Sequence, residues 1–125
     1  MPSVLLVDDD RTMVGLLSSL LTLDGFEAID GAGGSDLLMT VLARRPDAIL
    51  MDVFLAGRDG LGLLRSLKDD PQVADIPVVM TSGMEMSDEC RRLGAAEFLL
   101  KPYAPETLVE VLRRLTLNPQ EKARS

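Results

Sequence analysis

The stretch LLVDDDRTM, residues 5–13, joins an aliphatic run to the consecutive carboxylates of Asp8, Asp9 and Asp10. A continuous aliphatic run is typical of an interior strand of a parallel sheet, which is buried on both faces. Aspartate is disfavoured in strands and favoured as a helix cap, so we expect Asp10 to cap a helix that follows the strand. Asp8 and Asp9 then mark the carboxyl end of the strand, where open α/β sheets bind their ligands.

Outward from this stretch, short apolar runs alternate with segments of helical periodicity. The runs are SVLLV (3–7), FEAI (26–29), AILM (48–51), PVVMT (77–81) and EFLL (97–100). Between them, apolar residues recur at helical spacing, as in Met13, Leu16, Leu17 and Leu20, and the pattern over 84–93 is the weakest. This alternation predicts an α/β fold of the type (βα)₅, a doubly wound parallel five-stranded sheet with helices on both faces.

The composition indicates a single globular domain. The 125 residues are 46% hydrophobic and 26% charged, which is enough for one core and too few for two domains. We expect the domain to cover 1–118 and a polar tail to cover 119–125. The net charge of −7 argues against direct nucleic-acid binding, because that requires clusters of Lys and Arg.

Two residue types restrict the chemistry and the compartment. The chain has no histidine, so any histidine chemistry must come from a partner. The single cysteine, Cys90, cannot form an internal disulfide, and no signal peptide or membrane-spanning apolar run is present. We therefore expect a cytoplasmic protein with no membrane partner. The initial Met and the polar tail favour a free-standing chain over part of a longer protein with an output domain.

Polar residues follow four of the predicted strands. Asp8 and Asp9 follow the first, Asp52 the third, Ser82 the fourth and Lys101 the fifth. Because the carboxyl ends of parallel strands meet at one edge, these groups should converge there. Clustered carboxylates repel one another, and a divalent cation relieves that repulsion. Carboxylates beside a hydroxyl and an ammonium suit Mg²⁺ or Mn²⁺ and phosphoryl transfer.

Four motifs occur in order along the chain: VDDD (7–10), LMDVFLAGRDG (50–60), TSG (81–83) and LLKPY (99–103). They resemble the motifs of response-regulator receiver domains of two-component signalling, and the resemblance covers nearly the whole chain. It implies the flavodoxin-like strand order 2-1-3-4-5. It also implies a phosphoacceptor, not a dedicated enzyme. The phosphoryl group would come from a sensor histidine kinase or histidine phosphotransfer protein, and the receiver would control a downstream protein or output domain.

The same resemblance assigns roles around the acceptor. Asp52 would be the phosphoacceptor, whose carboxylate attacks phosphorus to form an acyl phosphate. Asp9, Asp52 and the backbone carbonyl of Phe54 would bind Mg²⁺ directly, and Asp8 would act mainly through a bound water. The metal would offset the repulsion between the acceptor and the phosphoryl group.

Three further residues would respond to the phosphoryl group. Lys101 would pair with one phosphoryl oxygen, and Ser82 would donate a hydrogen bond to another. Phe98 matches the switch aromatic of the family, and the Lys101–Pro102 bond is cis in the family. Phosphorylation would change the surface of the fourth helix, fifth strand and fifth helix, with phosphorylation-dependent dimerisation as one outcome.

The sequence departs from the common receiver pattern at Ala56, and two other classes of protein are alternatives for the same residues. Ala56 stands where many receivers have proline, which leaves the loop after Asp52 freer. Taken singly, Ser82 suits a turn and Lys101 a solvated surface; only the ordered set favours a site. An aspartate-nucleophile phosphatase of the haloacid dehalogenase type would need a second aspartate where this chain has Phe54. A flavodoxin-like FMN electron carrier would need more aromatic residues than the 3% found here.

Overall fold

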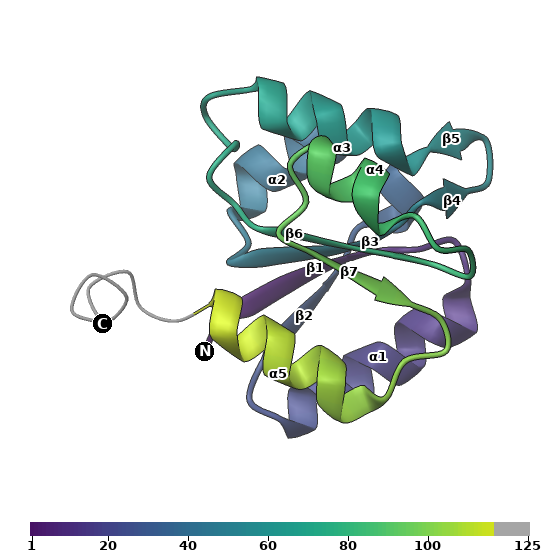
Figure 1. Ribbon diagram of the computed structural model, residues 1–125. Coiled ribbons are helices and arrows are strands. Elements are labelled where there is room, and N and C mark those ends of the chain that lie inside the picture. The colour runs from purple at the N-terminus through teal and green to yellow at the C-terminus, as the bar shows by residue number, and fades with distance from the viewer. Residues whose placement is uncertain (117–125) are drawn as a thin grey trace.

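The computed structural model describes residues 1–116, which form a parallel sheet between two layers of helices (Figure 1). The sheet has the order β2-β1-β3-β6-β7, and all neighbouring strands are parallel. Its strands are β1 (Ser3–Val7), β2 (Glu27–Asp30), β3 (Ala48–Asp52), β6 (Val78–Ser82) and β7 (Glu97–Leu100). The predicted fold class and strand order are confirmed. Two strands, β2 and β6, begin and end one residue later than predicted.

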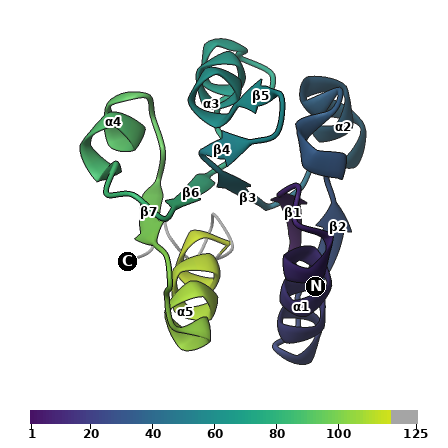
Figure 2. The same cartoon turned by 90° about the vertical axis from the view of Figure 1, so that its right-hand side faces the viewer.

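The helices divide between the two faces of the sheet. Figure 2 shows α1 (Arg11–Leu23) and α5 (Pro105–Leu115) on one side. The other side carries α2 (Leu37–Arg44), α3 (Gly60–Asp69) and α4 (Ser87–Arg92). The weak periodicity over 84–93 corresponds to α4, which is only six residues long. Within residues 1–116, no helix is long and apolar enough to cross a membrane.

The helix ends agree with the sequence signals. Asp10 caps α1, because its side chain accepts hydrogen bonds from the amides of Thr12 and Met13 at 3.0 and 3.2 Å. Pro105 occupies the first turn of α5, the helix position that proline favours. Asn118-Pro119 is a helix-stop signal in the sequence. This signal, the predicted domain end at 118 and the predicted tail over 119–125 lie outside the described residues.

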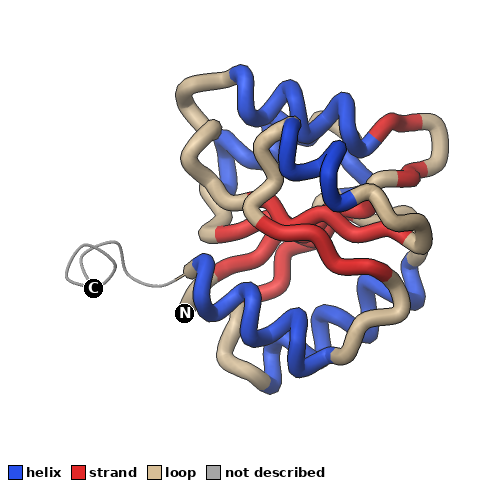
Figure 3. The backbone as a smooth tube through the Cα atoms, in the orientation of Figure 1, coloured by secondary structure: helices blue, strands red, loops and turns tan. Residues whose placement is uncertain are grey.

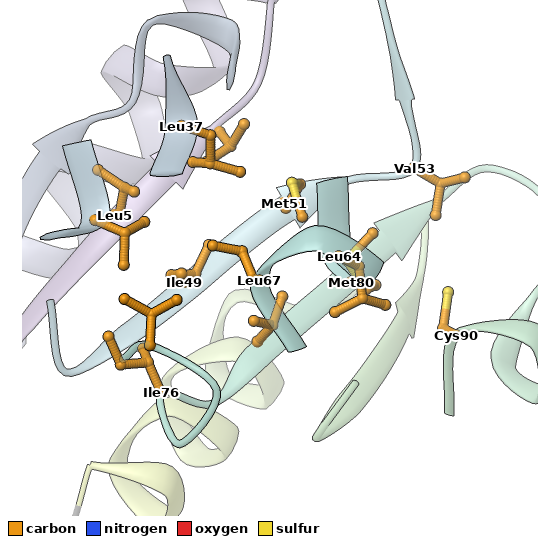
Figure 4. Close-up of a cluster of buried hydrophobic side chains, with 14 of the residues drawn as sticks. Leu5, Leu37, Ile49, Met51, Val53, Leu64, Leu67, Ile76, Met80 and Cys90 are labelled. Atoms are coloured by element: carbon orange, nitrogen blue, oxygen red, sulfur yellow. The ribbon is translucent and has the colours of Figure 1, made fainter. Parts of the chain in front are cut away.

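Each face of the sheet has its own hydrophobic core. One core packs under α2, α3 and α4, and Figure 4 shows part of it, including Met51, Leu64, Met80 and Cys90. The other packs under α1 and α5 around Leu21, Phe26 and Leu112. The core strands β1, β3 and β6 are buried along their whole length, which explains their uninterrupted apolar sequences.

A small antiparallel hairpin was not predicted. It consists of β4 (Phe54–Leu55) and β5 (Arg58–Asp59), and Figure 3 shows it outside the main sheet. Strands of two residues carry no detectable periodicity, so the sequence indicated only a loop. The hairpin returns the chain to Gly60, where a Cβ would lie 2.3 Å from the carbonyl oxygen of Asp52. Glycine therefore lets α3 begin directly against the end of β3.

Candidate functional site

Asp52 is the last residue of β3 and pairs in register with Thr81 of β6. Its side chain is only 11% exposed, and Lys101 Nζ lies 2.6 Å from its Oδ2 atom. The Oδ1 atom accepts a hydrogen bond from the amide of Phe54 at 3.0 Å. Lys101 is positioned by its own amide, which donates to the carbonyl of Ser82 at 2.8 Å. A nearly buried carboxylate is thus held by one ammonium and one amide.

Asp8 and Asp52 converge on a small cavity, with Thr81 and Tyr103 also in its wall. Burial raises the pKa of the Asp8 carboxyl, and the negative charge of Asp52 adds to this rise. The amide of Asp10 and the charge of Lys101 act in the opposite direction, but they do not cancel it. Burial therefore disfavours the ionised form of Asp8 more than its partners favour it.

Tyr103 was given no role by sequence reasoning, although it belongs to the LLKPY motif. Burial raises the pKa of its phenol to about 12, and the negative charges of Asp8 and Asp52 contribute. The phenol therefore stays protonated at neutral pH and can donate a hydrogen bond inside the cavity. Its position two residues after Lys101 was the sequence feature that could have placed it near the site.

Asp9 does not face the cavity with Asp8 and Asp52. Its Oδ2 atom accepts a hydrogen bond from the amide of Ala56 in the β4–β5 hairpin. Its Oδ1 atom lies against Gly33 of η1 (Ala32–Gly34), where a Cβ would come within 2.6 Å. Across residues 1–116, no three acidic, histidine or cysteine side chains are grouped as a metal site.

The donor chemistry nevertheless fits a hard divalent cation. Carboxylates and a backbone carbonyl are oxygen ligands of the kind that Mg²⁺ and Mn²⁺ take. Burial raises the pKa of the Asp8 carboxyl, and a cation bound beside it would favour its ionised form. Asp8 and Asp52 already share a cavity, whereas Asp9 would have to turn toward them. The metal roles of these residues and of the Phe54 carbonyl remain predictions.

Ser82 and Phe98 connect this edge of the sheet to the helical layer. Ser82 is fully buried at the end of β6, and its Oγ atom accepts a hydrogen bond from the amide of Met84 at 3.0 Å. Phe98 pairs in register with Met80 and is 8% exposed, in the same core as Cys90 of α4. Phe98 therefore points inward. The Lys101–Pro102 peptide bond is cis, as expected.

Glu97, at the start of β7, is a second residue that the sequence did not reveal. Its carboxylate accepts from Arg91 of α4 at 2.6 Å and from Arg114 of α5 at 2.9 Å. Burial would raise its pKa, but the amide of Phe98 and the two guanidinium groups hold the pKa of Glu97 below its ordinary value. One carboxylate thus ties α4 and α5 to the strand between them.

Comparisons with known proteins agree with this fold. A family model described as "Response regulator receiver domain" matches residues 4–113. The response regulator PleD of Caulobacter vibrioides is 37% identical over 116 residues, which are 90% of this chain and 26% of that protein. The DNA-binding response regulator MtrA of Mycolicibacterium smegmatis is 35% identical over 96% of this chain and 53% of its own length. The chain thus spans between about a quarter and a half of these curated relatives.

Solved structures give the same result. The chemotaxis response regulator CheY4 of Vibrio cholerae has a TM-score of 0.83 and 29% identity, over 92% of this chain and 98% of that one. The signal receiver domain of a signal transduction histidine kinase from Syntrophus aciditrophicus has a TM-score of 0.83 and 28% identity, over 93% and 90% of the two chains. With the family match over most of its length, this chain belongs to the response regulator receiver domain family.

Proposed function

We propose that the chain accepts a phosphoryl group on Asp52, with Mg²⁺ or Mn²⁺, from a sensor histidine kinase or a histidine phosphotransfer protein. The observation that carries this proposal is the nearly buried Asp52 carboxylate, held by Lys101 at 2.6 Å beside the cavity of Asp8. A buried carboxylate already paired with an ammonium is arranged to receive further negative charge.

The chemistry requires one bond to form and one to break. A carboxylate oxygen of Asp52 attacks the phosphorus of a phosphohistidine on the partner, the P–N bond breaks, and the histidine nitrogen retains the electron pair. Lys101 Nζ stays at the acceptor and pairs with a phosphoryl oxygen. Asp8, Asp9, Asp52 and the Phe54 carbonyl would hold the divalent cation, which would supply charge neutralisation when bound.

The proposal includes a switch on the surface formed by α4, β7 and α5. The Ser82 hydroxyl, which now accepts from the Met84 amide, would instead donate to the phosphoryl group. Phe98 packs in the core beneath α4, next to the strand that ends at Ser82. Movement of the segment after Ser82 would therefore reach α4 through this core. The changed surface would bind a downstream protein, an output domain or a second copy of the chain.

An apolar groove beside the acceptor supports a protein as phosphodonor. Met13, Leu16 and Leu20 of α1 face Pro102 and Pro105 across a groove of about 380 Å³, which Lys101 also borders. Leu16 is 63% exposed there. Because the chain has no histidine, the donor histidine must be supplied by another molecule. We propose that a helix next to that histidine occupies the groove.

The groove can be tested with a matched pair on α1. Leu16→Asp should lower phosphoryl transfer from a phosphorylated histidine phosphotransfer protein at least about tenfold relative to transfer from acetyl phosphate, which needs no docking. Leu23→Asp is the control, because Leu23 is 87% exposed and lies outside the groove. Equal effects of the two variants on transfer would overturn the docking assignment.

The acceptor itself is tested by intact-mass analysis. Incubation with acetyl phosphate should add one phosphate to the wild type in Mg²⁺ and none in excess chelator. Asp52→Asn should remain unmodified in Mg²⁺, while Asp69→Asn should behave like the wild type, because Asp69 is an exposed residue of α3. One added phosphate on Asp52→Asn under the same conditions would contradict the assignment.

The proposal retains the other expectations from the sequence. The domain would act as a signalling module without an enzymatic reaction on a separate substrate, and it would work in the cytoplasm. Its net charge of −7 remains unsuited to nucleic acid, so any DNA binding would belong to a partner or an output domain.

A further inference from the structure

The Asp9 carboxylate lies between two loops that are distant in sequence. On one side it accepts a hydrogen bond from the amide of Ala56, in the turn of the β4–β5 hairpin. On the other side it lies against Gly33 of η1, where φ is +65° and a Cβ would approach Oδ1 to 2.6 Å. The Asp9 side chain thus fastens the hairpin and lies beside the loop after β2.

This arrangement conflicts with metal binding by the same side chain. The predicted metal site would need an oxygen of Asp9 directed toward Asp8 and Asp52, the two carboxylates that line one small cavity. Neither oxygen of Asp9 is placed at that cavity, because Oδ2 accepts a hydrogen bond from the Ala56 amide and Oδ1 lies beside Gly33. A hydrogen bond from an amide to a charged carboxylate is stronger than one to a neutral acceptor, so releasing it opposes metal binding.

We propose that the Ala56 amide and the divalent cation compete for Asp9, so that metal binding releases the β4–β5 hairpin. The inference rests on the proposed metal site. Without metal, the hairpin is fastened to the end of β1. With metal, Asp9 turns to the cation and the Ala56 amide becomes free for solvent.

The β4–β5 hairpin connects Ala56 to the acceptor Asp52. Phe54, the first residue of β4, donates its amide to Asp52 Oδ1, and its side chain is 59% exposed. Leu55 follows it and is buried in the core under α3. Release at Ala56 therefore loosens the far end of a segment whose near end stays anchored at Asp52. The cation that prepares the acceptor also changes the surface that a phosphodonor meets there.

Titration of Mg²⁺ by isothermal calorimetry tests the competition. Ala56→Pro removes the N–H group and should bind Mg²⁺ about tenfold more tightly than the wild type. Ala56→Gly keeps the N–H group while changing the same turn, and it should bind within about twofold of the wild type. Equal affinities for the proline variant and the wild type would overturn the inference.

Amide NMR of the wild type gives a measurement that does not depend on the proline variant folding. The amide proton of Ala56 should move upfield and exchange faster with solvent as Mg²⁺ is added. Asp9→Ala without Mg²⁺ should show the same Ala56 position, because it removes the acceptor. An Ala56 amide that does not move while Asp8 and Asp52 respond to Mg²⁺ would overturn the competition alone. No response of Asp8 or Asp52 in the wild type would overturn the metal site of the proposed function.

Discussion

The helices on the two faces of the sheet differ in length and in the number of residues that they bury. On one face, α1 has 13 residues and α5 has 11. On the other, α2, α3 and α4 have 8, 10 and 6 residues. Four residues of α5 are buried, whereas α4 buries only Cys90. The α1–α5 face is therefore a firm support, and α4 is the α-helix held by the fewest buried side chains.

The hydrophobic cores beneath the two faces also differ in the types of side chain that they contain. Around α4 the buried side chains include Met51, Met80, Cys90 and Phe98. The fully buried side chains under α1 and α5 are aliphatic apart from Phe26, and Met13 and Tyr103 pack at the edge of that core. Methionine side chains adopt several conformations at little cost, so a core that contains them can repack. The acceptor thus stands between a face with an aliphatic buried core and a face whose buried core contains methionines and can adapt.

The largest expected effect is the loss of stability when a leucine side chain is shortened to alanine, compared between the two faces. Leu112→Ala in α5 should lower the free energy of unfolding by about 2–5 kcal/mol, because Leu112 is fully buried. Leu93→Ala, at the end of α4, should cost about 1 kcal/mol, since Leu93 is only partly buried. Urea denaturation measures both. If the α4 variant costs as much as the α5 variant, the faces do not differ as described.

Ser82→Ala should break the link from the acceptor to the adaptable face. Loss of a hydroxyl that bonds a charged group costs about 1.5–3 kcal/mol, which is a population shift of roughly tenfold or more. The variant should still bind beryllofluoride, but amide NMR should show reduced shifts over 84–103. Full wild-type shifts across that range would argue against the coupling.

Asp8→Asn should stabilise the protein, by about 0.5–2 kcal/mol at pH 7 in the absence of Mg²⁺. Folding raises the pKa of Asp8 through burial, so the folded state holds its proton more tightly than the unfolded state. Ionisation therefore destabilises the fold as the pH rises above 3.8, the ordinary value, and the gain should vanish below it. Thermal unfolding across pH measures this, and a less stable variant at pH 7 would contradict it.

The smallest expected effect concerns the carboxylate that ties the faces together. Glu97→Gln weakens the bonds to Arg91 and Arg114 and should cost about 0.2–1 kcal/mol, the range for exposed ion pairs. The pKa of Glu97 is lowered by folding, so this contribution is present above its ordinary value of 4.5 and is lost as the pH falls through the lowered value.

Hydrogen exchange locates that effect. In Glu97→Gln, amides of α4 should exchange faster, while those of α5 should change little because four buried residues hold that helix. The matched control is Glu110→Gln, an exposed substitution on α5. Equal acceleration in both helices would remove the distinction between the faces.

Much of this architecture follows from local sequence. The buried strands β1, β3 and β6 are unbroken apolar runs, and the turns and caps have the expected residues, as Asp10 and Pro105 illustrate. The hairpin could not be predicted, because each strand has two residues. It forms where the chain must return to Gly60 against the end of β3.

The candidate site also contains some contacts that the sequence predicts and others that it does not. The meeting of Asp52 with Lys101 follows from the rule that strand ends converge, and the structure places them 2.6 Å apart. The direction of Asp9 depends on Ala56, 47 residues later, and no local pattern contains that contact. The bonds of Glu97 likewise depend on how two helices pack beside β7.

Tyr103 is the sole tyrosine in a chain that has no tryptophan. Because Tyr103 lines the same cavity as Asp8 and Asp52, all of the tyrosine fluorescence of the protein originates at the candidate site. Nearby carboxylates quench an excited phenol, so any event that alters their charge or position should change the emission intensity. The unlabelled protein therefore carries a built-in optical probe, suited to stopped-flow measurements of cation or phosphodonor arrival.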